Sequence, residues 1–222
     1  SDEVKDEEIR PEEWPEWRKA DAAEWEKVAS TQAVKTLTVE ESEEVMKHLR
    51  SEGKTNRVLP SRIVRRWKPA EQPGEAPKRK SRWCVRGDKD PDLMFLDRYA
   101  PTATTAVISI ALQVGASLGF RCALGDLQNA FMQSDPLRRA EGRLFCKQPP
   151  GGLPGLDPRQ IVEILAGAYG LGDAPAHWRR SLKRVLLELG YVQSTMDPCL
   201  FKLVMQGRLE GLIIVEVDDL LS

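Results

Sequence analysis

The sequence predicts an α+β fold in which helices cover one face of an antiparallel sheet. Three observations support this prediction. Several stretches carry apolar residues at helical spacing, and short runs bounded by Gly and Pro indicate strands, two of which form a hairpin. The chain has 222 residues, of which 41% are hydrophobic, so it can bury the core of one globular unit with subdomains.

Two helices are predicted near the N-terminus. The first carries apolar residues at helical spacing: Trp14, Trp17, Trp25 and Val28. We interpret these tryptophans as core or docking residues rather than as a cofactor site. The second helix opens with the capping box Thr38-x-x-Glu41, carries Val45, Met46 and Leu49, and ends before Gly53.

Strands are predicted at 59–68 and 81–86, joined by a Pro/Gly-rich turn at 69–77. A mostly buried helix is expected at 104–118, ending near Gly119. In the next strand, 120–127, the residues Phe120, Cys122 and Leu124 alternate on one face, which Asp126 continues.

The C-terminal half is predicted to contain short strands at 143–147 and 160–165. An amphipathic helix follows at 174–189, ended by Gly190. A hairpin of strands 200–205 and 208–217 then turns at Gln206-Gly207. No internal repeat is present.

Composition excludes several classes of site. The four cysteines lack the spacing of a metal site and indicate reduced thiols, and two histidines make a zinc site or a histidine-based triad improbable. The longest apolar stretch, 106–120, is too short for a membrane span of roughly 20 residues, so we expect no membrane partner.

Charge is unevenly distributed along the chain. Residues 1–50 hold 15 acidic and 8 basic side chains, whereas 54–86 hold 11 basic and 2 acidic ones. The basic stretch is a candidate phosphate-binding surface, and its alternative is a solvated face. It places basic residues next to tryptophans, a pattern that suits nucleic-acid binding by Arg62, Arg65, Arg66 and Lys68.

Three aspartates at strand ends indicate a metal site. Asp218 and Asp219 follow an apolar run, and Asp126 ends a strand-like run upstream. Two carboxylates about 4 Å apart repel by about 4 kcal/mol at an effective dielectric of 20, so a fold that holds them together usually binds cations. The alternative for an isolated Asp-Asp pair is ordinary turn chemistry.

The order of several motifs resembles the reverse transcriptase of copia-type (Ty1/copia) LTR retrotransposon polyproteins over residues 14–222. These motifs are the basic block 78–82, the segment RYAPTA at 98–103, DLQNAF at 126–131, AYGL at 168–171, GYVQS at 190–194 with DPC at 197–199, and VDD at 217–219.

The resemblance implies the fingers and palm of a right-hand polymerase, with the thumb absent. We expect an acidic helical segment at 1–53, a basic fingers-like segment at 54–100 and a palm at 101–222 that is truncated at its C-terminus. The strand after Asp219 is then expected to leave an exposed, unpaired edge beside the site.

The implied activity is RNA-directed DNA polymerisation with two Mg²⁺ ions, or Mn²⁺ in their place, bound by Asp126, Asp218 and Asp219. Lys80 and Arg82 match positions that contact the incoming triphosphate. Leu127 matches a residue that lines the nucleotide site through its backbone, and Asp173 stands where the family has a nucleotide-contacting glutamine. Phe131 matches the residue that excludes a ribose 2′-hydroxyl, although a core aromatic is an equal interpretation.

Two departures from the family pattern keep an alternative open. Glu216 stands where the family has Tyr before Val-Asp-Asp, and Gly172-Asp173 replaces Lys-Gln. The alternative is a catalytically inactive, degenerate remnant that keeps the fold and nucleic-acid binding. A two-metal nuclease fits less well, because such sites usually add a helical glutamate and lack the basic block.

The resemblance also implies partners and a location. We expect an RNA or DNA template with its primer, deoxynucleoside triphosphates, and the remaining polyprotein regions, namely thumb, RNase H and integrase. Family habit implies a cytoplasmic virus-like particle, and no targeting signal is visible in the sequence.

Overall fold

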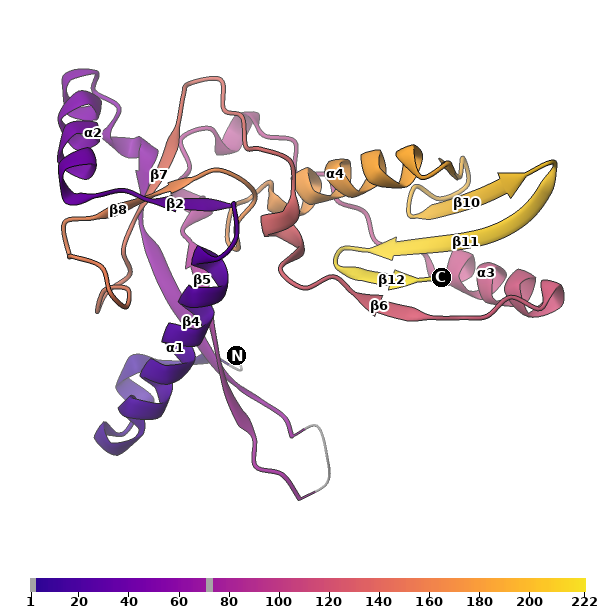
Figure 1. The fold of residues 1–222 in the computed structure, drawn as a ribbon, viewed down its shortest axis with the longest axis horizontal. Helices are drawn as coiled ribbons and strands as arrows, with labels where there is room; N and C mark the ends of the chain where they lie inside the picture. Colours follow the sequence, from indigo (N-terminus) through magenta and orange to yellow (C-terminus); the bar gives the residue numbers. More distant parts are fainter. Residues whose placement is uncertain (1–2, 71–73) are drawn as a thin grey trace.

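The computed structural model describes residues 3–70 and 74–222, which form a mixed α/β fold with four α-helices and three β-sheets. Figure 1 shows two lobes along the long axis of the molecule. One lobe holds the N-terminal elements with β7 (Leu144–Lys147) and β8 (Ile161–Ile164). The other holds α4 (Ala174–Glu188), α3 (Thr105–Leu118) and the C-terminal strands.

The predicted basic hairpin is confirmed as β4 (Ser61–Lys68) and β5 (Lys78–Val85), paired antiparallel along their whole length. The second strand begins three residues before the predicted start. Of the predicted turn at 69–77, residues 71–73 lie outside the described residues. β1 (Glu3–Val4) adds to the outer side of β4, and α1 (Trp14–Ala29) packs against β5.

A second sheet has the strand order β2-β8-β7-β3. Its strands come from all three segments expected from the sequence. β2 (Val34–Thr36) lies in segment 1–53, β3 (Val58–Leu59) in segment 54–100, and β7 and β8 in segment 101–222. Helix α2 (Val39–Ser51) starts at the predicted capping box, where Thr38 Oγ1 accepts from the Glu41 N–H and Glu41 Oε2 accepts from the Thr38 N–H. The capping box therefore satisfies two backbone N–H donors at the helix start.

The third sheet has the order β6-β12-β11-β10-β9, with every neighbouring pair antiparallel. The predicted hairpin is confirmed as β10 (Leu200–Met205) and β11 (Arg208–Glu216), with Gln206 and Gly207 both at positive φ in its two-residue turn. The remaining strands are β6 (Leu124–Asp126), β9 (Tyr191–Gln193) and β12 (Asp219–Leu221).

The expected unpaired edge after Asp219 is wrong. β12 bonds to β11 on one side and to β6 on the other, so it is an interior strand of its sheet. The backbone of Ala123 extends this pairing by exchanging two hydrogen bonds with Ser222, of 2.7 and 2.9 Å. The chain reversal at 217–218 therefore carries β12 into an inner position of the sheet.

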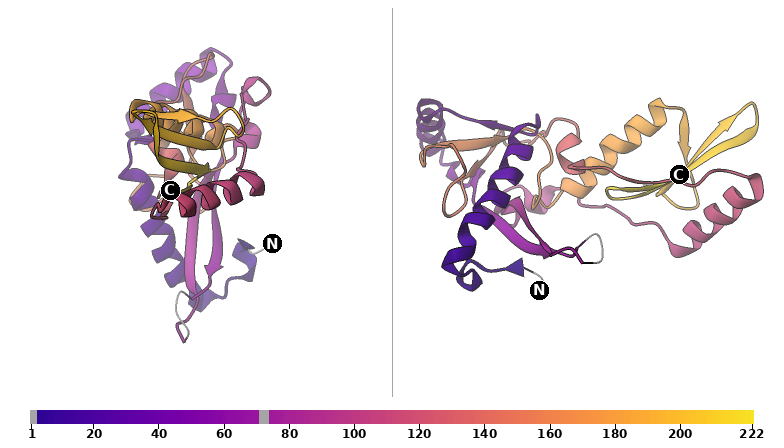
Figure 2. Two further views of the ribbon diagram at one scale, coloured as in Figure 1. Left: turned by 90° about the vertical axis from the view of Figure 1, so that its right-hand side faces the viewer. Right: turned by 60° about the horizontal axis from the view of Figure 1, so that its bottom comes forward.

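The expectation of helices on one face of the sheet is also wrong. α4 packs on Phe201 and Val215, whereas α3 packs on Ile214. Because successive residues of a strand point to opposite faces, Val215 and Ile214 lie on opposite sides of β11. The two helices therefore cover opposite faces, as the right-hand view of Figure 2 shows.

Two further predictions about this region need correction. Helix α3 ends at Gly119 as predicted, but among its residues only Val107 and Ala111 are buried, since a single face contacts the sheet. The strand predicted at 120–127 shortens to β6, and Leu124 is 84% exposed. The apolar composition of residues 104–118 correctly indicated the helix α3 but overestimated its burial.

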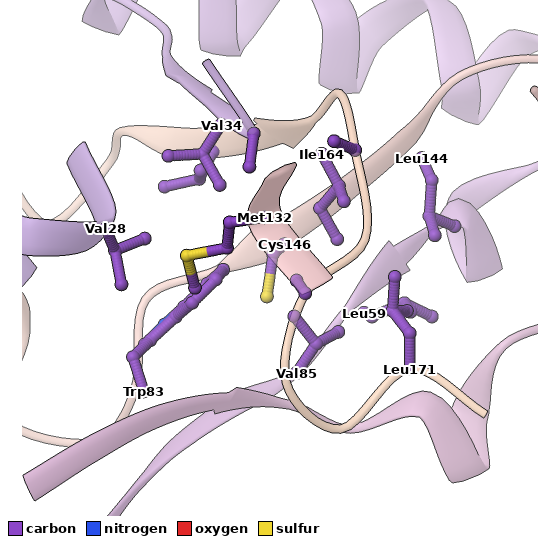
Figure 3. Packing of buried hydrophobic residues seen from close by; sticks show 14 of the residues in the cluster. Val28, Val34, Leu59, Trp83, Val85, Met132, Leu144, Cys146, Ile164 and Leu171 are labelled. Carbon is purple, nitrogen blue, oxygen red and sulfur yellow. The ribbon is translucent and has the colours of Figure 1, made fainter. Parts of the chain in front are cut away.

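The largest core lies in the N-terminal lobe. Figure 3 shows Trp83 and Val85 of β5 facing Val28 of α1, Val34 of β2 and Cys146 of β7. This cluster joins the basic hairpin to both the first helix and the four-stranded sheet. Short 3-10 turns connect the elements: η1 (Asp6–Glu8), η2 (Pro11–Glu13), η3 (Thr55–Arg57), η4 (Gly87–Lys89), η5 (Leu93–Phe95) and η6 (Ala130–Gln133). Of the described helices, none combines the length and apolarity needed to cross a membrane.

Candidate active site

The β11-β12 hairpin and β6 bring the three predicted aspartates to one end of the sheet. Glu216 pairs with Asp219, which leaves Val217 and Asp218 as the turn, and Asp219 pairs in turn with Asp126. The Asp218 carbonyl accepts from the Leu127 N–H at 2.8 Å. Residues about ninety positions apart in the sequence therefore lie beside one another.

The turn that carries Asp218 is fixed from outside the sheet. Val217 has a φ of 56°, a left-handed conformation that a β-branched residue seldom adopts. Its carbonyl accepts a hydrogen bond of 2.7 Å from Trp178 Nε1 of α4, a helix whose apolar face packs on the same sheet. Helix α4 thus holds the strained turn in place.

Asp126 and Asp218 line one cleft of about 320 Å³ together with Lys68, Lys80 and Arg82 of the basic hairpin. The far wall of this cleft comes from α1, through Glu24 and Lys27. The cleft therefore brings carboxylates of the five-stranded sheet together with cations of the basic hairpin. Residues named from the sequence line it, among them Asp126, Asp218, Lys80 and Arg82.

Tyr169 packs on the basic-hairpin side of the cleft. The guanidinium carbon of Arg82 lies 4.3 Å from the centroid of the Tyr169 ring, a cation–π contact. The Tyr169 carbonyl accepts from the Val85 N–H at 2.8 Å, and Gly170 follows at a φ of 91°. A Cβ on Gly170 would lie 2.0 Å from the Val85 carbonyl oxygen, so only glycine permits this approach of the loop to β5.

Several cations gather around Lys80 in the cleft. Burial lowers the pKa of Lys80, and the neighbouring charges of Arg82, Arg66 and Lys68 lower it further. Burial is the larger cause, and the smaller contribution of the neighbouring charges shows that several cations lie close to Lys80.

The donor set fits Mg²⁺. Asp126 and Asp218 both line the cleft, and Mg²⁺ is commonly bound by one or two carboxylates plus substrate phosphates and water. Asp219 pairs in register with Asp126 but is not among the residues that line the cleft. Within residues 3–70 and 74–222, no three His, Cys, Asp or Glu side chains group closely enough to hold an ion by themselves.

Arg65 does not fit its predicted role in nucleic-acid binding. It is buried, and its guanidinium is bound by Asp21 and Asp6 and stacked 5.1 Å from the Trp14 ring centroid. Ser81 Oγ also donates to Asp21. Arg65 therefore fastens α1 and η1 to β4. Its neighbours Arg62 and Arg66 are exposed, as nucleic-acid contact requires, and Arg62 pairs with Glu3.

Asp173 does not fit the nucleotide site. It is 3% exposed and forms two hydrogen bonds with Arg139, of 2.6 and 2.9 Å, at the start of α4. Burial by itself raises the pKa of Asp173, but the hydrogen bond and the charge of Arg139 outweigh burial, and the pKa is lowered. An ionised carboxylate committed to a buried arginine is not available to a ligand.

Two other predicted residues lie beside the cleft. The Phe131 ring packs edge-on against Tyr169, with centroids 5.3 Å apart, and contacts two apolar clusters. It supports the cleft residue Tyr169 without lining the cleft itself. Leu127 lines the cleft and also contacts the core under α4.

Sequence reasoning missed the contribution of α1. Glu24 and Lys27 belong to the acidic stretch 1–50, to which the sequence analysis assigned no binding residue. They reach the cleft because the buried residues Trp25 and Val28, between and beside them, pack on the core around Trp83. The helical spacing of the tryptophans could have identified the buried face, but nothing in the pattern showed what that face meets.

Paired carboxylates and a basic hairpin around one cleft are typical of proteins that bind phosphate-containing ligands. Residues 45–222 match the family described as reverse transcriptase (RNA-dependent DNA polymerase), and the chain belongs to this family. Its relatives include the Retrovirus-related Pol polyproteins from transposons RE1 and RE2 of Arabidopsis thaliana, 29% and 30% identical over 143 residues, 64% of this chain.

A third relative is the Putative transposon Ty5-1 protein YCL074W of Saccharomyces cerevisiae, 31% identical over 97 residues, or 43% of this chain and 30% of that protein. The predicted resemblance to copia-type retrotransposon polyproteins is confirmed. The matched segment spans only 9% and 10% of the length of the two Arabidopsis polyproteins.

Proposed function

We propose that this chain is the fingers and palm of an RNA-directed DNA polymerase, which adds deoxynucleotides to a primer 3′-hydroxyl. The observation that carries the proposal is the single cleft that Asp126 and Asp218 share with Lys80 and Arg82. Nucleotidyl transfer requires carboxylates near the reacting phosphate and cations near the leaving pyrophosphate. One cleft between the two lobes supplies both.

Asp126 and Asp218 are the residues that would hold Mg²⁺ or Mn²⁺. When bound, two such ions stabilise the attacking and leaving oxygens of an in-line displacement. The Leu127–Asp218 backbone hydrogen bond and the Trp178–Val217 hydrogen bond hold the backbone segments that carry the two carboxylates beside each other. Asp219, which pairs with Asp126 across β12 and β6, would be the third carboxylate of the metal site.

The basic hairpin would bind the substrates. Lys80 and Arg82 face the cleft and would contact the triphosphate, and the Tyr169 ring restricts where the Arg82 guanidinium can lie. Arg62, Arg66 and Lys68, on the paired strand β4, would contact the template or primer backbone. Leu127 would present its backbone to the nucleotide.

A second candidate function is nucleic-acid binding without turnover. It is favoured by Glu216, which pairs in register with Asp219 and adds a negative charge beside the proposed metal ligands. Additional repulsion there would raise the concentration of divalent ion that the site requires. The basic hairpin would still bind nucleic acid in such a protein.

Primer extension on an RNA template in the presence of Mg²⁺ separates the two functions. We expect extension by the parent chain and a loss of at least about a hundredfold in Asp126→Asn and Asp218→Asn, since each removes a charge that binds the ions. Asp88→Asn, an exposed aspartate paired with Arg86, is the matched control. Retained template binding without extension in the parent would favour the inactive alternative.

The relatives suggest the setting in which such a core works. RE1 and RE2 are Pol polyproteins by name, so we propose that thumb, RNase H and integrase regions of a similar polyprotein are its partners. A cytoplasmic virus-like particle would be the corresponding location.

A further inference from the structure

The N-terminal helix lies outside the residues that match the reverse transcriptase family, yet it forms one wall of the cleft. The match begins at residue 45, whereas α1 ends at Ala29. Glu24 and Lys27, one turn apart on this helix, line the cleft with Asp126 and Asp218. Helix α1 is therefore a structural part of the proposed nucleotide site.

Glu24 is held in the cleft by the hairpin. Its Oε1 accepts from the backbone N–H of Trp83 at 3.3 Å, on the side of β5 that faces away from β4. The neighbours of Trp83 along β5 include Arg82, a cleft cation. Burial raises the pKa of Glu24, while the Trp83 N–H and the charges of Arg82, Lys27 and Lys80 oppose this effect. A carboxylate thus lies within electrostatic range of three cations.

These three cations are available to a ligand. In the described part of the chain, neither Lys27, Lys80 nor Arg82 has a carboxylate oxygen within 4.0 Å. Glu24 acts on them only through space. The charge of Lys27 strengthens the attraction of Lys80 and Arg82 for phosphate, and the charge of Glu24 weakens it.

We propose that helix α1 sets the affinity of the cleft for the nucleotide triphosphate through two opposed charges, with Lys27 attracting the phosphates and Glu24 repelling them. The proposal rests on the proposed function, because it takes a deoxynucleoside triphosphate as the ligand of the cleft. It assigns an affinity-determining role to residues outside the matched region.

The two charges predict changes of opposite sign. Replacing Lys27 by Ala removes an attractive charge and should weaken binding of Mg²⁺–dTTP about two- to fivefold at low salt, because interactions across several ångströms of solvent are modest and screened. Replacing Glu24 by Gln keeps an acceptor for the Trp83 N–H and should tighten binding by a similar factor. Lys27→Arg should restore parent affinity.

Equilibrium binding of Mg²⁺–dTTP, inorganic tripolyphosphate and thymidine tests this proposal on the 222-residue chain. The matched controls are Glu26→Gln and Lys19→Ala, exposed charges of the same helix outside the cleft. The expected result is that Lys27→Ala weakens, and Glu24→Gln tightens, the binding of both dTTP and tripolyphosphate. Thymidine binding should be unchanged in both variants. Thermal unfolding of each variant checks that the fold is kept.

The remaining outcomes are distinct. Parent binding of dTTP with no shift, or with shifts of the same sign, in Lys27→Ala and Glu24→Gln would overturn the role of α1 and leave the proposed function standing. No binding of dTTP or tripolyphosphate by the parent chain would overturn both.

Discussion

At the scale of single residues, burial separates the arginines of the basic hairpin into two kinds. Arg65 and Arg66 are adjacent in the sequence, but strand alternation sends Arg65 inward to Asp21 and leaves Arg66 exposed. Composition alone treats them as equivalent phosphate contacts. The pattern therefore predicted a basic surface correctly but assigned one of its structural residues to the ligand.

Arg65→Ala should destabilise the fold by about 3 kcal/mol, because it leaves the partly buried Asp21 carboxylate without its partner. Arg62→Ala, which removes an exposed pair with Glu3, should cost no more than about 1 kcal/mol. Urea unfolding of both variants measures the difference. Equal effects would mean that the Asp21–Arg65 contact contributes little to stability.

Asp173 gives the fold a defined pH dependence. The pKa of Asp173 is lowered in the folded state. Its contribution to stability is therefore present above the unfolded-state pKa of about 3.9 and is lost as pH falls through the folded-state pKa. Urea unfolding at pH 7 and near pH 3 should show a smaller drop in Asp173→Asn than in the parent. An equal drop would assign the acid sensitivity to other carboxylates.

At the scale of elements, the approach of the 168–171 loop to β5 positions the cleft. Gly170 carries both a positive φ and a contact that admits no side chain. The loop supplies Tyr169, which contacts Arg82 on one side and Phe131 on the other. The position of Arg82 in the cleft therefore depends on a glycine in a separate part of the sequence.

Gly170→Ala should destabilise the protein by roughly 2–4 kcal/mol, because the new Cβ forces the loop away from β5 in addition to the strain of positive φ. Gly53→Ala, also at positive φ but in open space, should cost about 1 kcal/mol. Thermal or urea unfolding compares them. A cost at Gly170 no larger than at Gly53 would contradict the close packing of loop and strand.

Local signals predicted most elements, and long-range pairing was harder to predict. The Thr38 capping box, the Gly119 helix end and the Gln206-Gly207 turn each depend on neighbours in the sequence, and each was predicted correctly. The insertion of β12 between β11 and β6 depends on a residue pairing between Asp219 and Asp126. The single apolar face of α3 depends on where the sheet lies, which hydrophobic composition does not encode.

At the scale of the whole molecule, the cations and the carboxylates of the cleft come from different lobes. The N-terminal lobe carries the basic hairpin, and the C-terminal lobe carries Asp126 and Asp218 at the end of its sheet that faces the first lobe. Motifs of the family named Asp126, Asp218, Lys80 and Arg82 as site residues, and these four residues line one cleft. The sequence did not predict the α1 wall, because that wall forms only when the first helix packs on β5.

Binding of a primed template should weaken with salt, since phosphate contacts release counterions. Arg66→Ala should reduce the slope of log affinity against log salt by about one. Arg159→Ala, an exposed arginine paired with Asp157, should leave the slope unchanged. A salt-independent affinity, or equal effects of the two variants, would contradict the assignment of the hairpin to the nucleic acid.

We propose Asp126 and Asp218 as the metal ligands of a polymerase. The most direct test is single-turnover incorporation of one deoxynucleotide into a primer on an RNA template, measured across Mg²⁺ concentrations for the parent and Asp218→Asn. We expect Mg²⁺-dependent incorporation by the parent and incorporation at least about a hundredfold slower in Asp218→Asn, with dTTP still bound by the cations. Incorporation at the parent rate in Asp218→Asn would show that Asp218 is not a metal ligand of the reaction.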